Sequence, residues 1–324
     1  MPIGPSAAGH PLLEQALRSI AAQAETVQLA VLDASGRADV AETLDRYAGL
    51  IQHRRTGPDS GQAAAIQEGW DALDADVLGW LNADDLLYPD ALRMASQALD
   101  DYPDADWITG QSLFFDHDPA TGRFVFTGLH PEAAAPSDRL FRTNTVSQPS
   151  TFVRREALDR VGWLNTDLHY TMDWDLWARL RSAGFSAHYV PVPLSAVLMA
   201  QGTKTSSFNA NRRREIRALV NRHAGPYAAW KSLAAFWLTH RADQETGRGP
   251  FTALRDLLRR PTASQAVSES GSEPCRLVHY SDGILELEDG TEVPPGTIHH
   301  ACALSSGSED PGTVRLVPAG SERE

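Results

Sequence analysis

The sequence contains one stretch, Val77-Leu78-Gly79-Trp80-Leu81-Asn82-Ala83-Asp84-Asp85, in which an apolar run ends in two adjacent carboxylates. Such a run predicts a buried strand with negative charge at a solvent-reachable edge of a sheet. Two neighbouring carboxylates repel each other unless a cation lies between them or one is protonated. Because hard oxygen ligands suit Mg²⁺ or Mn²⁺, we predict a divalent cation at Asp84 and Asp85 that holds a substrate diphosphate. The alternative is a helix start, where Asp is also common.

The residues before this stretch alternate between helix and strand patterns. Helices are predicted over residues 12–23, 40–47 and 63–73, and strands over residues 27–33, 50–53 and 76–81. This alternation indicates βαβ units and a parallel sheet, which binds ligands at the carboxyl ends of its strands. Asp33 and Asp84 both lie at such ends, so we expect one crevice to hold both.

The residues after 110 predict a mixed sheet packed on the first half. A hairpin over 112–116 and 123–126, strands over 150–154, 187–191 and 195–199, and a helix over 173–183 are expected. The predicted division is a main α/β domain (1–205, with halves 1–110 and 111–205), a basic helical extension (206–260), a linker (261–274), a small β unit (275–304) and a disordered tail (305–324).

Charge is distributed unevenly along the 324 residues, whose net charge is −13. Residues 211–260 hold ten Arg and one Lys against four acids, which gives +7 and leaves −20 for the remainder. The acidic bulk argues against nucleic acid as the main partner. The basic segment, which begins with Arg212, Arg213 and Arg214, suits an anionic membrane surface, an anionic acceptor or an acidic face of the same protein. A solvated helix face is the alternative.

The location that the sequence favours is cytoplasmic, with peripheral contact at the inner membrane face. No apolar stretch has membrane-spanning length, and no signal-peptide pattern is present. Cys275 and Cys302 are too few for a disulfide framework.

Six motifs together resemble family two of the inverting GT-A glycosyltransferases, over about residues 3–205. In chain order they are Ser19-Ile20-Ala21-Ala22-Gln23, Val31-Leu32-Asp33-Ala34-Ser35-Gly36-Arg37-Ala38-Asp39, Asp59-Ser60-Gly61-Gln62-Ala63-Ala64-Ala65-Ile66, Trp80-Leu81-Asn82-Ala83-Asp84-Asp85, Gln148-Pro149-Ser150-Thr151-Phe152 and Asp173-Trp174-Asp175-Leu176-Trp177-Ala178-Arg179-Leu180. The resemblance implies an α/β fold of GT-A type, a Rossmann-like mixed sheet flanked by helices.

The resemblance also implies a donor site. Asp33 would accept hydrogen bonds from the nucleotide base or ribose, Asp39 would support the same pocket, and Asp59 and Gln62 would border the nucleotide. Asp84 would bind the metal that bridges the donor diphosphate, and Asp85 would act through water or shape the site. Helix capping and turn formation are the structural alternatives for the first four residues.

The same resemblance implies that Asp173 is the general base, with Asp175 as its rival. A base must reach the acceptor hydroxyl, and displacement from one face inverts the anomeric configuration. Trp174 and Trp177 are candidates for stacking on a sugar, although packing within the core suits Trp177 better.

The implied activity moves a sugar from a nucleoside-diphosphate sugar to a hydroxyl of a glycan or lipid-linked acceptor, in cell-surface polysaccharide or glycolipid synthesis. The sequence departs from the family at three points, and the short start and the missing basic residues favour the alternative, a catalytically silent GT-A domain that binds a nucleotide or a partner. Only a short segment precedes the first helix, Met172 replaces a common Glu, and residues 197–201 lack Arg and His. A nucleotidyltransferase is a weaker alternative, because no Gly-rich basic loop follows the first strand.

Overall fold

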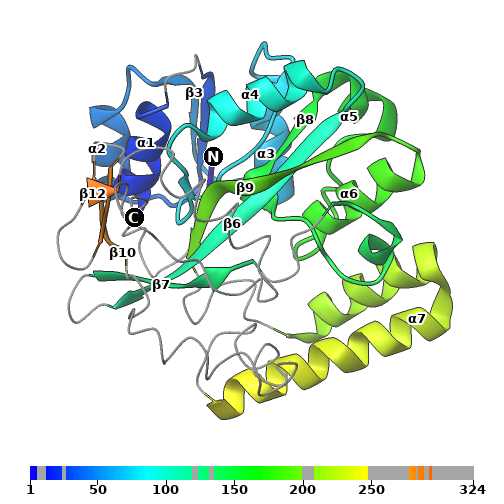
Figure 1. Cartoon of the computed structure of the whole chain (residues 1–324). Helices are drawn as coiled ribbons and strands as arrows, with labels where there is room; N and C mark the ends of the chain where they lie inside the picture. The colour runs from blue at the N-terminus through cyan, green and yellow to red at the C-terminus, as the bar shows by residue number, and fades with distance from the viewer. Residues whose placement is uncertain are drawn as a thin grey trace, which may run out of the picture.

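The first half of the chain forms a parallel sheet in which a helix follows each strand (Figure 1). The computed structural model describes residues 1–5, 12–23, 27–118, 123–130, 135–198 and 208–246, and three short strands between 277 and 293. The sheet has the order β1 (Pro2–Ile3), β2 (Leu29–Asp33), β3 (Ile51–Thr56), and its helices are α1 (Leu13–Ala21), α2 (Ala38–Arg46) and α3 (Gln62–Asp71). Because Ile3 is the partner of Asp33, short β1 still reaches the carboxyl end of β2.

The second sheet is mixed and six-stranded. Its order is β4 (Val77–Leu78), β8 (Thr151–Arg154), β6 (Trp107–Asp118), β9 (Ala187–Leu198) and β5 (Leu86–Leu87), with β7 (Arg123–Leu129) paired to β6. β6 and β9 run parallel, whereas the other pairs are antiparallel. The remaining helices of this half are α4 (Ala91–Asp101), η1 (Asp138–Phe141), η2 (Gln148–Ser150), α5 (Arg155–Val161) and α6 (Met172–Ser182).

The last long element, α7 (Ala210–Thr246), bends sharply at Gly225, where φ is 85°, and Pro226 follows. Its two arms fold back on each other (Figure 1), and the rings of Phe208 and His240 lie 5.7 Å apart. Strands β10 (Leu277–Ser281), β11 (Ile284–Leu287) and β12 (Glu292–Val293) form a small antiparallel sheet. Within the described ranges, no helix has both the length and the apolar character needed to cross a bilayer.

The predicted α/β class is confirmed, and most expected elements are present within a few residues. The prediction of two separate strands over residues 187–191 and 195–199 is wrong, because β9 is one continuous strand. Pro191 and Pro193 explain the error: proline donates no ladder hydrogen bond, and the pairing of β6 with β9 shifts register beside them. The strand over 76–81 shortens to β4. The linker, the tail and residues 247–260 lie outside the described residues.

A stack of three tryptophans joins the halves of the protein. Trp177 of α6 lies fully buried between Trp80 and Trp107, with ring centroids 5.8 and 5.5 Å away and interplanar angles of 16° and 7°. Trp70 packs edge-on against Trp80 at 5.5 Å. Aromatic side chains bury large apolar areas, so this stack fixes α6 against the strand end that leads to Asp84.

We predict that Trp177→Ala lowers the free energy of unfolding by about 3–5 kcal/mol, because it removes the middle ring and leaves a cavity. Urea denaturation measures this loss. Trp230→Ala, at an exposed position on α7, is the matched control and should change the same quantity by less than about 0.5 kcal/mol. Equal losses in the two variants would show that the stack does not anchor the fold.

Candidate functional site

Asn82 lies at the centre of a polar network just after β4. Its side-chain carbonyl accepts a hydrogen bond from Gln62 Nε2 at 2.9 Å, and its amide donates to Asp85 Oδ2 at 2.9 Å and to Gln148 Oε1 at 3.3 Å. Gln148 Nε2 in turn donates to the backbone carbonyl of Trp80 at 2.6 Å. The structure thus links the predicted site residues Gln62 and Asp85 through Asn82. Asn82 and Gln148 lay in recognised motifs but were not predicted as site residues.

Asp85 is buried beside the less buried Asp84. Burial raises the pKa of Asp85 well above its ordinary range, and the neighbouring Asp84 charge raises it further. Hydrogen bonds from Asn82 and from the backbone N–H of Leu198 act in the opposite direction on that pKa. A divalent cation bound to both carboxylates would relieve the repulsion between their charges.

This donor set fits a cation that shares its coordination with a substrate. Among the described residues, no group of three or more His, Cys, Asp or Glu side chains could hold a metal ion. Mg²⁺ is usually held by one or two carboxylates together with substrate phosphates, so Asp84 and Asp85 satisfy that requirement without a third protein ligand.

Asp33 carries a buried acceptor without a partner. Its Oδ1 accepts from the backbone N–H of Ser35 at 2.8 Å and from the Ser35 hydroxyl, whereas its Oδ2 is buried and has no hydrogen-bond partner among the described residues. A buried polar atom without a partner is uncommon in proteins and calls for an explanation such as a bound ion, a water molecule or a catalytic role. The capping alternative accounts for Oδ1 but not for Oδ2.

Asp59 shapes the turn that leads into α3. Its Oδ1 accepts from the Gly61 backbone N–H at 2.9 Å, and Gly61 has a φ of 115° that favours glycine. A Cβ at Gly61 would lie 3.8 Å from Nδ1 of His169, in the loop before α6. The turn that carries Asp59 and Gln62 therefore lies close to the loop that leads to Asp173.

Asp173 lies in the first turn of α6. Its Oδ2 accepts from Asn144 Nδ2 at 3.2 Å. Burial raises the pKa of Asp173, while backbone N–H groups of the helix start, the Arg212 charge and the Asn144 hydrogen bond lower it. Burial lowers the pKa of Arg212, and the Asp173 charge raises it. Arg212 is half-buried and interacts with the Asp173 charge, whereas Arg213 and Arg214 are exposed.

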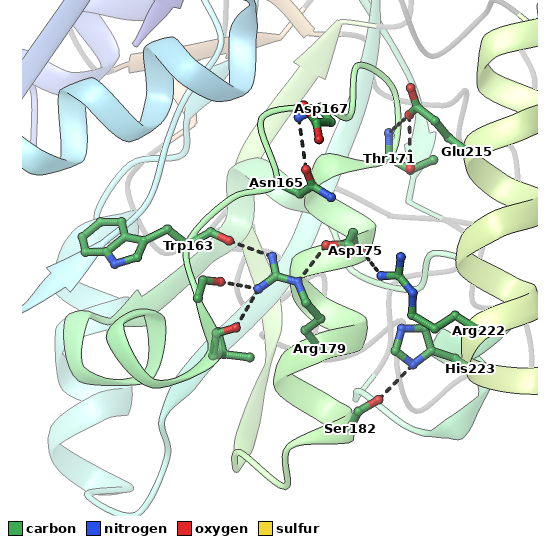
Figure 2. A network of polar contacts seen from close by, with 12 residues as sticks. Trp163, Asn165, Asp167, Thr171, Asp175, Arg179, Ser182, Glu215, Arg222 and His223 are labelled. Carbon is green, nitrogen blue, oxygen red and sulfur yellow. Dashed lines mark hydrogen bonds and ion pairs between the residues drawn. The ribbon is translucent and has the colours of Figure 1, made fainter.

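Asp175 has a different environment from Asp173, although it lies two residues away. Its buried carboxylate forms ion pairs with Arg179 at 2.7 Å and with Arg222 at 3.2 Å (Figure 2). Arg179 also donates to backbone carbonyls of residues 161–163. The ion pairs of Asp175 therefore hold α6 in position, and Asp175 does not share the environment of Asp173.

Two other predicted site residues lie away from the network. Trp174 is buried, and its indole N–H donates to the Leu140 carbonyl at 2.6 Å. Sugar stacking by Trp174 is therefore wrong, because its ring is packed in the core. Asp39 lies on the surface, where Arg37 donates two hydrogen bonds to it at 2.9 and 2.6 Å and lowers its pKa. The structure does not bring Asp39 to the unpartnered oxygen of Asp33.

Glu215 of α7 holds the loop before α6. Its buried carboxylate accepts from the backbone N–H groups of His169, Tyr170 and Thr171 at 2.8 to 3.0 Å, and from the Thr171 hydroxyl at 3.2 Å. The side chain of Asn209 donates to the Tyr170 hydroxyl at 2.5 Å. Figure 2 shows Glu215 directed at the start of α6. Its backbone partners lie 44 to 46 residues away, so local sequence gave no signal for this role.

A family model described as "Glycosyltransferase like family 2" matches residues 5–221. The chain belongs to this glycosyltransferase family. The match covers the second sheet, strands β2 and β3 of the first sheet and most of the first arm of α7, so the matched region includes Asp33, Asp84, Asp173 and Glu215. A comparison with curated proteins finds no match.

Solved structures show the fold of this family 2 member. S. aureus TarS in complex with UDP-GlcNAc is 14% identical, covers 74% of this chain and 70% of its own, and gives a TM-score of 0.52. The mannosyltransferase PcManGT from Pyrobaculum calidifontis, in complex with GDP-Man and Mn²⁺, is 17% identical, covers 84% and 80%, and gives 0.48. The likeness to TarS confirms the expected GT-A fold.

We predict that Glu215→Ala lowers the free energy of unfolding by about 3 kcal/mol, because three backbone N–H groups lose a charged acceptor. Urea denaturation measures the loss, and hydrogen exchange should accelerate at residues 169–171. Glu68→Ala is the control, since Glu68 forms an exposed ion pair with Arg55 and should cost less than about 1 kcal/mol. Unchanged exchange at residues 169–171 would contradict the role given to Glu215.

Proposed function

We propose that this family 2 member transfers a sugar from a nucleoside-diphosphate sugar to a hydroxyl acceptor, with inversion of the anomeric configuration. One observation carries the proposal. Gln62, at the start of α3, donates to Asn82, whose network includes Asp85, and the neighbouring Gly61 turn lies close to His169 in the loop before α6, where Asp173 lies in the first turn. This sequence of neighbours supports one site that uses both the Asp84–Asp85 pair and the Asp173 carboxylate, whose pKa is raised by burial.

The donor side of the proposal rests on oxygen acceptors. Asp33 Oδ2 would accept an N–H group of the base or a ribose hydroxyl, and Asp59 and Gln62 would border the nucleotide. Asp84 and Asp85 would hold Mg²⁺ or Mn²⁺. When bound, the cation would neutralise charge that develops on the leaving nucleoside diphosphate.

The acceptor side of the proposal rests on Asp173. Its carboxylate would take the proton of the acceptor hydroxyl as that oxygen attacks the anomeric carbon opposite the leaving group. Asn144 and Arg212 both favour the ionised form of Asp173, which is the form that a base requires. Asp175, bound between Arg179 and Arg222, would fix the position of α6 and not exchange the proton.

The acceptor in this proposal is a growing cell-surface glycan or a lipid-linked sugar, and the setting is the cytoplasmic face of a membrane. The support is the basic character of residues 211–260, which suits an anionic lipid surface. The acidic remainder of the chain gives no comparable support for nucleic acid.

We predict that one nucleotide among UDP, GDP and dTDP binds in the presence of Mn²⁺ and loses its affinity in EDTA. Asp84→Asn should weaken the metal-dependent binding by about tenfold or more, because it removes one ligand charge. Calorimetric titration measures both effects. Asp100→Asn, which changes an exposed acid on α4, is the control and should bind as the wild type does. Binding that is equal with Mn²⁺ and with EDTA would exclude the cation site.

We predict that Asp173→Asn lowers kcat by about 10²- to 10⁴-fold while nucleotide affinity stays unchanged, because only proton transfer is lost. Donor turnover and calorimetry measure the two quantities. Asp167→Asn, which changes an exposed acid in the loop before α6, should retain full kcat.

The pH profile gives an independent test of the base. Because burial raises the pKa of Asp173 above the ordinary value of 3.8, the acidic limb of kcat should lie above that value. Below the limb Asp173 is protonated and inactive as a base.

A wild type that binds nucleotide but transfers no sugar to any glycan or lipid-linked acceptor would favour the alternative function, a catalytically silent domain that binds a nucleotide.

A further inference from the structure

The second arm of α7 exposes large apolar side chains to solvent. Tyr227, Trp230 and Leu238 are 70%, 66% and 60% exposed. Across the described residues, two other large apolar side chains are prominently exposed, Trp237 on the same arm and Tyr102 elsewhere. Apolar groups gathered on one surface usually mark a site of interaction, whereas single ones do not.

These side chains share one face of the helix. Positions 227, 230 and 238 follow helical spacing, and the rings of Tyr227 and Trp230 stack with centroids 6.4 Å apart. The opposite face is attached to the body of the protein: Ser232 is buried, and its hydroxyl donates to the Arg142 carbonyl at 2.9 Å. Figure 1 shows this arm along the outer edge of the molecule.

The helix that carries this face is basic as a whole. Lys231 Nζ lies 5.2 Å from the Tyr227 ring, and Arg213, Arg214 and Arg217 are exposed on the first arm. Over Ala210–Thr246 the sequence holds seven basic residues against three acids, Glu215, Asp243 and Glu245, and Glu215 is buried. Tryptophan and tyrosine beside cationic side chains are typical of helices that lie in the interface of an anionic membrane.

A second copy of the chain fits this face less well than a lipid surface does. Two-fold pairing through this face would bring the positively charged Lys231 of each copy together. Aromatic side chains offer about 150–250 Å² each, so the face supplies on the order of 400 Å², whereas a stable interface buries about 800 Å² per partner.

We propose that the outward face of α7, formed by Tyr227, Trp230, Lys231 and Leu238, docks the protein onto an anionic membrane surface. This inference deepens the proposed function, in which the acceptor is lipid-linked or membrane-proximal. It assigns the contact to the aromatic second arm, where the exposed rings of Tyr227 and Trp230 stack beside Lys231.

The test is sedimentation of the full chain with vesicles made of equal parts phosphatidylcholine and phosphatidylglycerol, and with phosphatidylcholine alone. We expect binding to the anionic vesicles, and a fall of about tenfold or more for the double variant Tyr227→Ala/Trp230→Ala. Lys231→Glu should weaken binding and reduce its dependence on salt. Tyr102→Ala, which also removes a half-exposed aromatic ring, should bind as the wild type does.

Three outcomes would overturn the inference. The first is that the wild type does not sediment with anionic vesicles, and the second is that the double variant sediments equally well. The third is that the wild type is a dimer that binds no vesicles, whereas the double variant is a monomer. Light scattering after size exclusion detects the dimer. Thermal unfolding and Mn²⁺-dependent nucleotide binding, both unchanged in the double variant, show that it is folded. Because sedimentation needs no turnover, failure of the membrane contact is distinguishable from failure of the transferase proposal.

Discussion

The placement of Trp177 between Trp80 and Trp107 is the contact on which the geometry of the site depends. Trp80 is two residues before Asn82, and Trp177 is one helical turn after Asp173. The stack therefore sets the distance between the carboxylate pair at one strand end and the carboxylate at the start of α6. Burial of large rings resists sliding because each ring fills a closely packed space. Core packing thus sets the overall placement of these carboxylates, and polar contacts then adjust it.

Polar contacts to α7 adjust the position of α6. These contacts also give different environments to Asp173 and Asp175, two acids with a similar sequence context. Asp175 forms ion pairs with Arg179 and Arg222, so it ties α6 to α7 and serves the fold. Asp173 receives one side-chain hydrogen bond and the more distant charge of Arg212, so burial dominates and its pKa rises. An acid with a raised pKa beside an acid held in ion pairs is a pattern by which proteins separate catalytic from structural carboxylates.

The sequence predicted those features that a short segment encodes by itself. Strand and helix periodicity gave most elements, and the motifs contained Gln62 and Asp85, which Asn82 links by hydrogen bonds. Periodicity does not specify which face of a helix meets a ligand, so Trp174 was misplaced. Nor does a motif reveal long-range partners: Glu215 acts on residues 44 to 46 positions away, and Arg212 was read only as part of a positive run.

The two arms of α7 connect the site to the surface of the molecule. The first arm carries Glu215 and Arg222, which hold α6, and the second carries Tyr227 and Trp230 on its outward face. Gly225 has a φ of 85°, which only glycine adopts without strain, so the bend has a defined direction. The second arm is also fixed to the body by Ser232 and by packing of Phe236 on Trp174. A membrane bound by the outward face would therefore lie at a set orientation to Asp173, because no freely rotating linker separates the two.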